Sequence, residues 1–521
     1  MSKHLNPIVL EEKIRFSQSM MWKDQKKYYD LKGIDAWDED VPFYITSNPF
    51  IARGYAQIAI GFIQDWAQQN PAAVDHPFYL LELGAGTGQF SFYFLKNLLE
   101  LQKILKLDHI KIRYLMSDVS ETPFEFWESQ LTLKPFLDSG VLDFCIFDIY
   151  HSVDFQLHRS KQTVGALQMQ NPLMVVANYL FDSIATDVFT VNNGELHESL
   201  VTLTTDAANL NKGVPKDWKD VTITYTENKI EKKYYDNTFD NILFSYPNQL
   251  IDTHFQFPIA SLSAIKNLQT IANNKFLLLT SDKGYTNLEE LDHCEYPELD
   301  FHGSFSVMVN YHAIGEFLKQ SGGENFIQSF RENIVSGVFS SGFELNTMPQ
   351  LTLASKQMIQ GFSPTDYFLI YEHFTEHYKE CSLEVMSSYL NLSAWDPYVF
   401  DHISDHLCEL TPEGDPEVIS YLAGHMHLIA ANFYYLPTSA DTLFNIALFF
   451  QSVSKFEEAI EYYKKSQIYF GENDVVLFNI GMCLYSLDRN AEAVTYLESA
   501  LALNANATDA LDWIEVIKKE V

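Results

Sequence analysis

Residues 80–90 read Leu-Leu-Glu-Leu-Gly-Ala-Gly-Thr-Gly-Gln-Phe, and this stretch decides the class of fold. An apolar run meets three glycines at alternate positions, after which the pattern becomes that of an amphipathic helix. Glycine adopts positive φ at no steric cost and has no Cβ, so a ligand can lie directly on the backbone at the start of a helix. The stretch therefore predicts a strand, a ligand-binding loop and a helix. The alternative is a turn without a ligand, because short glycine motifs give false positives.

The spacing of Gly84, Gly86 and Gly88 separates two classes of adenosine cofactor. A dinucleotide fingerprint has the spacing G-x-G-x-x-G, with its third glycine inside the helix. Here the spacing is G-x-G-x-G, and Glu82 stands two residues before the first glycine. A carboxylate there would repel a pyrophosphate, but it suits the cationic methionine end of S-adenosylmethionine. We therefore expect this loop, including Ala85, to bind S-adenosylmethionine, with Glu82 holding the methionyl ammonium directly or through water.

Composition limits the classes of partner. The chain has 521 residues, of which 47% are apolar, so it can form about three domains with substantial cores. With 35 Lys and Arg against 69 Asp and Glu, the net charge is −34, which disfavours nucleic acids and anionic membranes as partners. A basic protein substrate is favoured, although solubility alone explains the charge equally well.

Cysteine usage and the first residues bear on location. The five cysteines are scattered and never in C-x-x-C spacing, which is typical of free thiols in a reducing compartment. Residues 1–24 mix acidic and basic side chains without an apolar core, so they resemble no signal peptide. No apolar run reaches membrane-spanning length. We expect a cytoplasmic protein, and export by a route that reads no N-terminal signal remains open.

The fold class follows from the alternation of apolar runs and helical patterns. From residue 78 to about 323 these alternate as in a parallel sheet covered on both faces. The expected strands are 78–83, 110–117, 141–147, 173–178 and 276–280. Residues 191–275 break the rhythm and indicate a β-rich insertion, closed by a helix over 259–271. The prediction is an α/β Rossmann-like domain over 78–364, preceded by an N-terminal helical segment, 1–77, that packs on it.

Beyond about residue 365 the pattern is helical only, and it contains an internal repeat. Leu443-Phe444-Asn445-Ile446 recurs as Leu477-Phe478-Asn479-Ile480, and Glu458-Ala459 recurs as Glu492-Ala493, each 34 residues later. This period resembles that of tetratricopeptide repeats, clearest over 441–508, in a C-terminal domain of 365–521. Such repeats present a groove to a peptide, form a homodimer or serve packing alone.

Polar residues at strand ends are candidates for the cofactor site. Asp118 is placed for the ribose hydroxyls, with Ser120 and Glu121 as competitors. Asp148 is a candidate acceptor for the adenine amino group while Phe147 packs on the ring. The alternative for Asp148 is a helix N-cap.

Four segments, in order, resemble the MidA-like methyltransferases. Residues 177–184, Ala-Asn-Tyr-Leu-Phe-Asp-Ser-Ile, are similar to the family's A-N-E-x-x-D-A-L segment. Residues 44–49 resemble its F-x-T-S-P-E entry, 278–284 its fifth strand and D-Y-G turn, and 306–311 its T-A-H-V-D-F segment. The resemblance covers about residues 25–345. It implies a class I methyltransferase that uses S-adenosylmethionine, releases S-adenosylhomocysteine and methylates an arginine of a protein partner.

The resemblance also implies which residues act on the acceptor. Asn178, Tyr179 and Asp182 would be catalytic, with Asn178 also at the cofactor. Tyr179 stands where the family has Glu, and Asn310 where it has Asp, which weakens recognition of a guanidinium. Asp182 can still form a bidentate pair, and Tyr179 can still stack on the acceptor. The alternative for Asp182 is a cap on the following helix.

Two histidine pairs are the remaining chemical constellation. His373 with His377 and His402 with His406 are each one helical turn apart, and Cys408 follows the second pair. No third ligand has convincing spacing, so we expect no metal site.

The leading hypothesis is a protein methyltransferase whose C-terminal repeats bind the substrate protein or a second copy of the chain. The alternatives are a non-catalytic scaffold that retains the fold, and a methyltransferase of small molecules.

Overall fold

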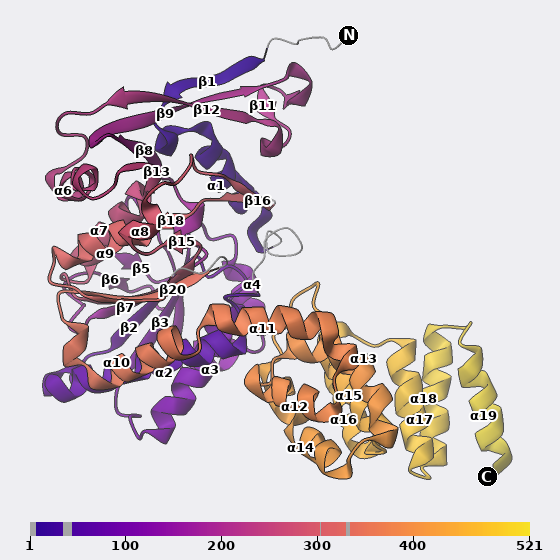
Figure 1. Ribbon diagram of the computed structural model, residues 1–521. Coiled ribbons are helices and arrows are strands. Elements are labelled where there is room, and N and C mark those ends of the chain that lie inside the picture. Colours follow the sequence, from indigo (N-terminus) through magenta and orange to yellow (C-terminus); the bar gives the residue numbers. More distant parts are fainter. Residues whose placement is uncertain (1–6, 35–43, 303, 330–333, 521) are drawn as a thin grey trace, which may run out of the picture. The chain divides into compact units, whose positions relative to one another are not determined.

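The computed structural model describes residues 7–34, 44–302, 304–329 and 334–520 (Figure 1). Two compact units divide the chain, Met1–Phe368 and Leu369–Val521, and the boundary falls inside helix α11 (Pro364–His377). We expected a boundary at 364/365. Residues 1–6 and 35–43 of the expected N-terminal segment lie outside the described residues.

A seven-stranded sheet lies at the centre of the first unit, in the order β19-β20-β14-β7-β2-β3-β4. The strands from β14 to β4 are parallel, whereas β20 is antiparallel to β14 and β19 is antiparallel to β20. Their bounds are β2 (Phe78–Leu83), β3 (Ile112–Asp118), β4 (Leu142–Ile146), β7 (Leu173–Asn178), β14 (Phe276–Asp282), β19 (Asn325–Ile327) and β20 (Val335–Ser341).

The five expected strands are all present and pair in parallel, as expected. Every residue of β2 is buried, which explains why its sequence reads as a continuous apolar run. The antiparallel strands β19 and β20 were not expected. Residues 335–341 read Val-Ser-Gly-Val-Phe-Ser-Ser. Every residue of this strand is buried, but its serines interrupt the apolar run from which a buried strand is recognised.

Helices cover both faces of this sheet. Figure 1 shows α2 (Pro49–Gln69), α3 (Gln89–Ile104) and α10 (Pro349–Ser355) on one side, and α7 (Ile259–Ile271) and α9 (Tyr311–Lys319) on the other. Helix α2 begins where Asn48 accepts a hydrogen bond from the backbone N–H of Ile51, with Pro49 in the first turn. Shorter helices are α4 (Phe124–Ser129), α5 (Lys134–Asp138), α6 (Asn237–Leu243) and α8 (Leu288–Leu291).

The insertion and the N-terminal strand β1 together form a five-stranded antiparallel sheet. The order of its strands is β1-β9-β8-β13, and β12 also pairs with β9. The bounds are β1 (Ile8–Ile14), β8 (Asp187–Asn192), β9 (Glu195–Thr205), β12 (Thr222–Lys229) and β13 (Asp252–Phe257). The N-terminal segment was expected to be helical, and β1 corrects that expectation: these residues pair with β9, about 190 positions later, which local pattern does not reveal.

Two-residue and three-residue strand pairs complete the first unit. They are β5 (Phe155–Gln156) with β6 (Thr163–Val164), β10 (Leu210–Asn211) with β11 (Val214–Pro215), β15 (Gly284–Tyr285) with β18 (Val309–Asn310), and β16 (Asp300–His302) with β17 (Ser304–Ser306).

Helix α1 (Met20–Lys32) is fixed to the first unit at several points. The Ser19 side chain accepts from the Met21 N–H at its start, the indole N–H of Trp22 donates to the Phe16 carbonyl at 2.9 Å, and the amide of Gln25 donates to the Phe305 carbonyl at 2.8 Å. These contacts hold one face of α1 in place.

The second unit is helical throughout its described residues. Its helices after α11 are α12 (Leu383–Leu392), α13 (Pro397–Leu410), α14 (Pro416–Asn432), α15 (Thr442–Ser452), α16 (Phe456–Phe470), α17 (Asp474–Ser486), α18 (Asn490–Leu503) and α19 (Thr508–Glu520). The hairpins α15/α16 and α17/α18 correspond to the two copies of the repeat. Ala459 and Ala493, which match in the repeat, are both fully buried at the crossings.

Gly481 tests the close approach of α17 and α18. A Cβ at this position would lie 2.8 Å from Cγ of Leu497 and 3.3 Å from the carbonyl oxygen of Ala493. We expect Gly481→Ala to lower the free energy of unfolding by about 1 kcal/mol, because overpacking outweighs the gain in helix propensity. Gly424→Ala in α14 is the matched control, since nothing lies within 4 Å of its Cβ. Chemical denaturation that finds Gly481→Ala as stable as Gly424→Ala would contradict this close packing.

Candidate functional site

The glycine loop joins β2 to α3 in a left-handed conformation. Gly84, Gly86 and Gly88 have φ of 65°, 53° and 79°, values that strain any residue with a side chain. Gly88 is the N-cap residue of α3, and the N–H of Ala85 donates to the Ser117 carbonyl on β3 at 2.9 Å. The loop is therefore bare of side chains at its glycines and is tied to the neighbouring strand.

Glu82 is buried beneath this loop. Its side chain is 6% exposed, and its Oε2 accepts hydrogen bonds from the hydroxyl of Tyr114 at 2.6 Å and from Ser91. Burial raises the pKa of Glu82 to about 7, although both hydrogen bonds act to lower it. The carboxyl group therefore changes charge near neutral pH.

Two cavities meet at the loop. The larger, with about 1200 Å³ of empty space that includes its open mouth, extends between α1 and the ends of β3, β4 and β7. The smaller, about 450 Å³, includes Glu82, Thr46 and Thr87 in its lining. Gly84, Gly86, Asn178 and Tyr179 line both cavities.

Asp118 and Asp148 both line the larger cavity. Asp118 Oδ1 accepts from the Val119 N–H at 2.7 Å, and burial raises the pKa of this carboxyl group to about 6. Of its two competitors, Ser120 lines the cavity, whereas Glu121 is not among the lining residues.

Asp148 stabilises a turn and no helix follows it. Its Oδ1 accepts from the Tyr150 N–H at 2.8 Å. Partial burial acts to raise its pKa, but the Tyr150 N–H and His151 outweigh this, so the pKa of Asp148 lies below the usual carboxyl range. Asp148 therefore caps a turn and not a helix, and its carboxyl group also faces the cavity.

The structure does not bring Phe147 to the cavity. Its side chain is 3% exposed, belongs to the hydrophobic core on the α7 side of the sheet and packs against Phe155 with ring centroids 5.8 Å apart. Phe147 continues the face of β4 on which Cys145 lies in the same core, so its ring points into that core. The apolar side chains that line the cavity near Asp118 and Asp148 are Val119 and Ile149.

Asn178 and Tyr179 lie where β7 ends. Asn178 Oδ1 accepts from the hydroxyl of the buried Tyr55 at 3.0 Å. Tyr179 has φ of 50°, unusual for a bulky residue, and its N–H donates to the Ser281 carbonyl at 3.1 Å. This backbone conformation, held by the neighbouring strand β14, presents the tyrosine to both cavities.

Asp182 lies behind the cavity wall and is not one of its lining residues. It occupies the 3₁₀ turn Phe181–Ser183, is 1% exposed and accepts a hydrogen bond from Ser183 at 2.8 Å. Ser183 does line the cavity. No helix begins at Asp182, so its carboxyl group is not the helix cap that was the alternative interpretation.

Asn310 lies apart from both cavities. It is 1% exposed, its Oδ1 accepts from the Ala313 N–H as the N-cap of α9, and its Nδ2 donates to Tyr246 and to the Gln256 carbonyl. Aspartate could fill the same cap. This departure from the family pattern therefore concerns a helix end and leaves the site unchanged.

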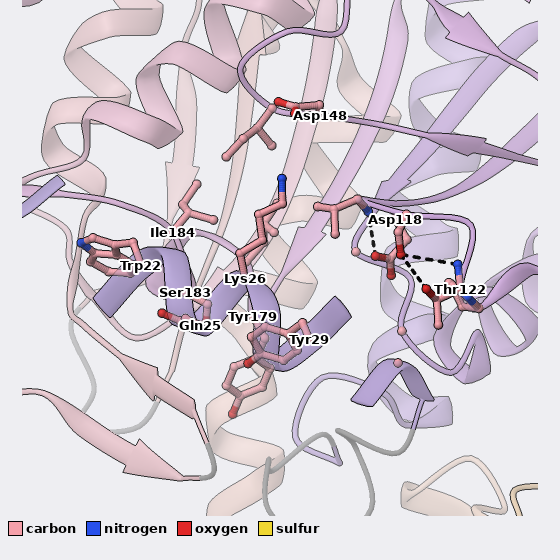
Figure 2. Close-up of a pocket in the computed structure, with 18 of the residues that line it drawn as sticks. Trp22, Gln25, Lys26, Tyr29, Asp118, Thr122, Asp148, Tyr179, Ser183 and Ile184 are labelled. Atoms are coloured by element: carbon pink, nitrogen blue, oxygen red, sulfur yellow. Dashed lines mark hydrogen bonds between the residues drawn. The ribbon is translucent and has the colours of Figure 1, made fainter. Parts of the chain in front are cut away.

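Helix α1 supplies one wall of the larger cavity and was not expected there from the sequence. Trp22, Gln25, Lys26 and Tyr29 line it, and Figure 2 shows them opposite Asp118 and Thr122. These four positions have the spacing i, i+3, i+4 and i+7, which is one helix face. Two aromatic residues on one face of a helix in which six of thirteen residues are charged were the available signal.

The histidine pairs make ordinary packing and hydrogen-bonding contacts. His377 Nδ1 pairs with the His373 carbonyl, His402 Nε2 with the Thr375 carbonyl and His406 Nδ1 with Glu409. Among the described residues there is no group of three or more His, Cys, Asp or Glu side chains arranged to hold a metal.

Comparisons with known proteins agree with this geometry. Residues 57–291 match the model of a family described as "Putative S-adenosyl-L-methionine-dependent methyltransferase", and residues 440–467 and 475–506 match tetratricopeptide repeats. The fold class and the cofactor expected from the sequence are thereby confirmed. None of the curated proteins matches the chain.

Solved structures from Burkholderia thailandensis are among those similar to the chain. An uncharacterized protein has 14% identity and a TM-score of 0.40, covering 64% of this chain and 90% of its own. A protein described as a "likely methyl transferase", bound to S-adenosyl-homocysteine, has 13% identity and a TM-score of 0.40, and the match covers 63% of this chain and 88% of that protein. Magnesium protoporphyrin IX methyltransferase from Synechocystis has 10% identity and a TM-score of 0.28, covering 61% and 96%.

No helix among the described residues combines the length and the apolar character needed to cross a membrane.

The raised pKa of Glu82 predicts pH-dependent cofactor binding. If the ionised carboxylate holds the methionyl ammonium, affinity for S-adenosylmethionine increases about tenfold between pH 6 and pH 8, because a group with a pKa near 7 is about one-tenth ionised at pH 6. Isothermal titration calorimetry measures this. Glu82→Gln should bind more weakly at pH 8 and lose the dependence, whereas Asp118→Asn should retain most of it. The same pH dependence in wild type and Glu82→Gln would exclude this role.

Proposed function

We propose that this chain, which through residues 57–291 belongs to a family of S-adenosylmethionine-dependent methyltransferases, methylates a side chain of a protein substrate in the cavity between α1 and β7. The catalytic domain would span 78–364, and the repeats of 365–521 would bind the protein that carries the acceptor.

The observation that carries this proposal is the junction of the two cavities. Asp118 and Asp148 lie on the larger cavity and suit an adenosine, while Glu82 lies on the smaller and suits a methionyl ammonium. Asn178 and Tyr179 line both, which supports a position for them at the junction of the two halves of the cofactor. The cofactor supplies an electrophilic methyl group, and the chain's own residues need chiefly to hold and align the acceptor.

Arginine is the proposed acceptor. Asp182 Oδ2 and Asp282 Oδ1 are buried and have no hydrogen-bond partner among the described residues. A guanidinium group has five N–H donors and also stacks on aromatic rings, which Trp22, Tyr29 and Tyr179 offer in the larger cavity. Buried polar atoms without partners are rare, and these two lie behind the cavity wall, so they support a donor-rich acceptor that reaches them when the turn Phe181–Ser183 moves.

One observation favours a second candidate, a small acceptor with an acidic hydroxyl group. Lys26 lines the larger cavity and makes no hydrogen bond or ion pair to a described residue. A cation there opposes a guanidinium and stabilises a phenolate or carboxylate.

Transfer of label from tritiated S-adenosylmethionine to host-cell lysate separates these candidates. We expect a labelled protein band whose initial rate of labelling drops by about 10²–10⁴ in Asp182→Asn, the usual contribution of general base catalysis. Asp138→Asn, at an exposed position, is the matched control and should label normally. Label confined to the small-molecule fraction would favour the second candidate. Cofactor binding without any transfer would identify a scaffold.

A further inference from the structure

Ser183 connects the acceptor side of the cavity to a carboxyl group that the cavity does not reach. Its side chain lines the cavity, and its hydroxyl group donates to Asp182 Oδ1 at 2.8 Å. The hydroxyl of Tyr29, which pairs with Ser304 at 2.7 Å, has Ser183 as a further hydrogen-bonding neighbour. Hydroxyl groups from α1, from the turn after β7 and from β17 thus meet at this end of the cavity.

Asp182 itself is closed off from the acceptor. It is 1% exposed, and its Oδ2 has neither solvent contact nor a hydrogen-bond partner among the residues that the structure describes. Direct contact with an acceptor would require the turn Phe181–Ser183 to move. In the observed arrangement, the contact between Asp182 and the cavity passes through Ser183.

The titratable and charged groups around Asp182 favour a state in which only one of the two buried carboxyl groups, Asp182 and Asp282, carries a charge. Asp282 and Lys283 face it from the end of β14 and the turn after it, Asp300 from β16, Tyr29 from α1, and Tyr179 and Tyr311 from the end of β7 and from α9. Burial raises the pKa of Asp182 to about 6, with Lys283 lowering it and Asp300 raising it.

Asp282 is placed to remain the protonated member of the pair. Burial, followed by the charge of Asp182, raises the pKa of Asp282 well above the usual carboxyl range. Its Oδ2 has the hydroxyl of Tyr311 at 3.2 Å and that of Thr280 at 3.3 Å. Two adjacent buried carboxyl groups cannot both ionise readily, so Asp182 is the one that exchanges a proton near neutral pH.

We propose that Ser183 and Asp182 form a proton relay for the methyl acceptor. The acceptor nitrogen or oxygen gives its proton to Ser183 Oγ while the Ser183 hydroxyl proton moves to Asp182 Oδ1. The acceptor gains the methyl group, whose bond to sulfur breaks with the electron pair remaining on sulfur. Ser183 would be catalytic, and Asp182 would act through it. This inference rests on the proposed function.

Two sequence departures agree with such a relay. Tyr179 stands where the MidA-like segment has Glu, so a carboxylate is missing from the cavity wall. Ser183 stands where the same segment has Ala, so the hydroxyl that reaches the buried carboxylate here is absent from that segment. In this proposal the carboxylate that the family segment has at position 179 is replaced by Asp182, which lies behind the cavity wall and is connected to it by the hydrogen bond from Ser183.

A binding experiment tests the relay without an acceptor. The probes are S-adenosylhomocysteine and its analogue sinefungin, whose ammonium group takes the place of the transferred methyl. Both share the adenosine and methionyl parts, so titration of Glu82 and Asp118 cancels in the ratio of their affinities. We expect calorimetry to find that the ratio shifts about tenfold towards sinefungin between pH 5 and pH 7.5, the effect of a one-unit coupling of two charges.

Variants of Asp182 and Ser183 separate the contributions of these two residues to the pH dependence of the affinity ratio. Asp182→Asn should abolish the pH dependence of the ratio. Ser183→Ala should move its midpoint to higher pH, because the carboxylate loses a hydrogen-bond donor, and Ser183→Thr should restore the wild-type midpoint. Ser304→Ala, which removes a hydroxyl bonded to Tyr29 but not to Asp182, is the matched control and should behave as wild type.

The outcomes are distinct. A ratio that is independent of pH in the wild type, or that changes equally in Asp182→Asn, would overturn the relay while leaving cofactor binding intact. Failure of S-adenosylhomocysteine to bind the wild-type protein would overturn the proposed function itself. In the labelling assay, Ser183→Ala should lower kcat with little change in the KM for S-adenosylmethionine, and Ser183→Thr should recover the wild-type kcat.

Discussion

The parallel pairing of β2 with β3 on one side and β7 on the other is the constraint on which the site depends. Parallel strands end at the same edge of a sheet, so this pairing brings the glycine loop, Asp118 and Asn178 together. The strands are buried on both faces, and a slip of one residue would turn every side chain to the opposite face. The register is therefore strongly specified, and the positions of the polar residues at the strand ends are specified with it.

Residues whose role depends on the strands could be predicted from the sequence. The runs of β2 and β7 are continuous and apolar, so their ends, and hence Glu82, Gly84 and Asn178, could be placed from local pattern. Phe147 shows the limit of this reasoning. It follows β4 directly and shares the face of Cys145, which directs it into the core, whereas Ile149 lies in the turn that follows and lines the cavity.

Residues whose role depends on distant pairing could not be predicted. Strand β1 forms against β9, and α1 is positioned by bonds to residues as far along the chain as Phe305. The positions of Trp22 and Tyr29 in the cavity wall follow from these long-range contacts. Periodicity shows that they share a helix face, but nothing near them in the sequence identifies what that face covers.

The departures at Asn310 and Tyr179 from the family pattern differ in physical meaning. Asn310 keeps a role that Asp can also fill, because a helix N-cap requires only a side-chain acceptor for a backbone N–H. Tyr179 changes the charge of the cavity wall, because a tyrosine is not charged at neutral pH, whereas the family's Glu would bring a carboxyl group there. The nearest remaining carboxylates, Asp182 and Asp282, are buried, where ionisation is costly and a partner is needed. An acceptor that needs one of these two carboxylates would therefore either bring a donor to their oxygens or reach them through the hydroxyl group of Ser183.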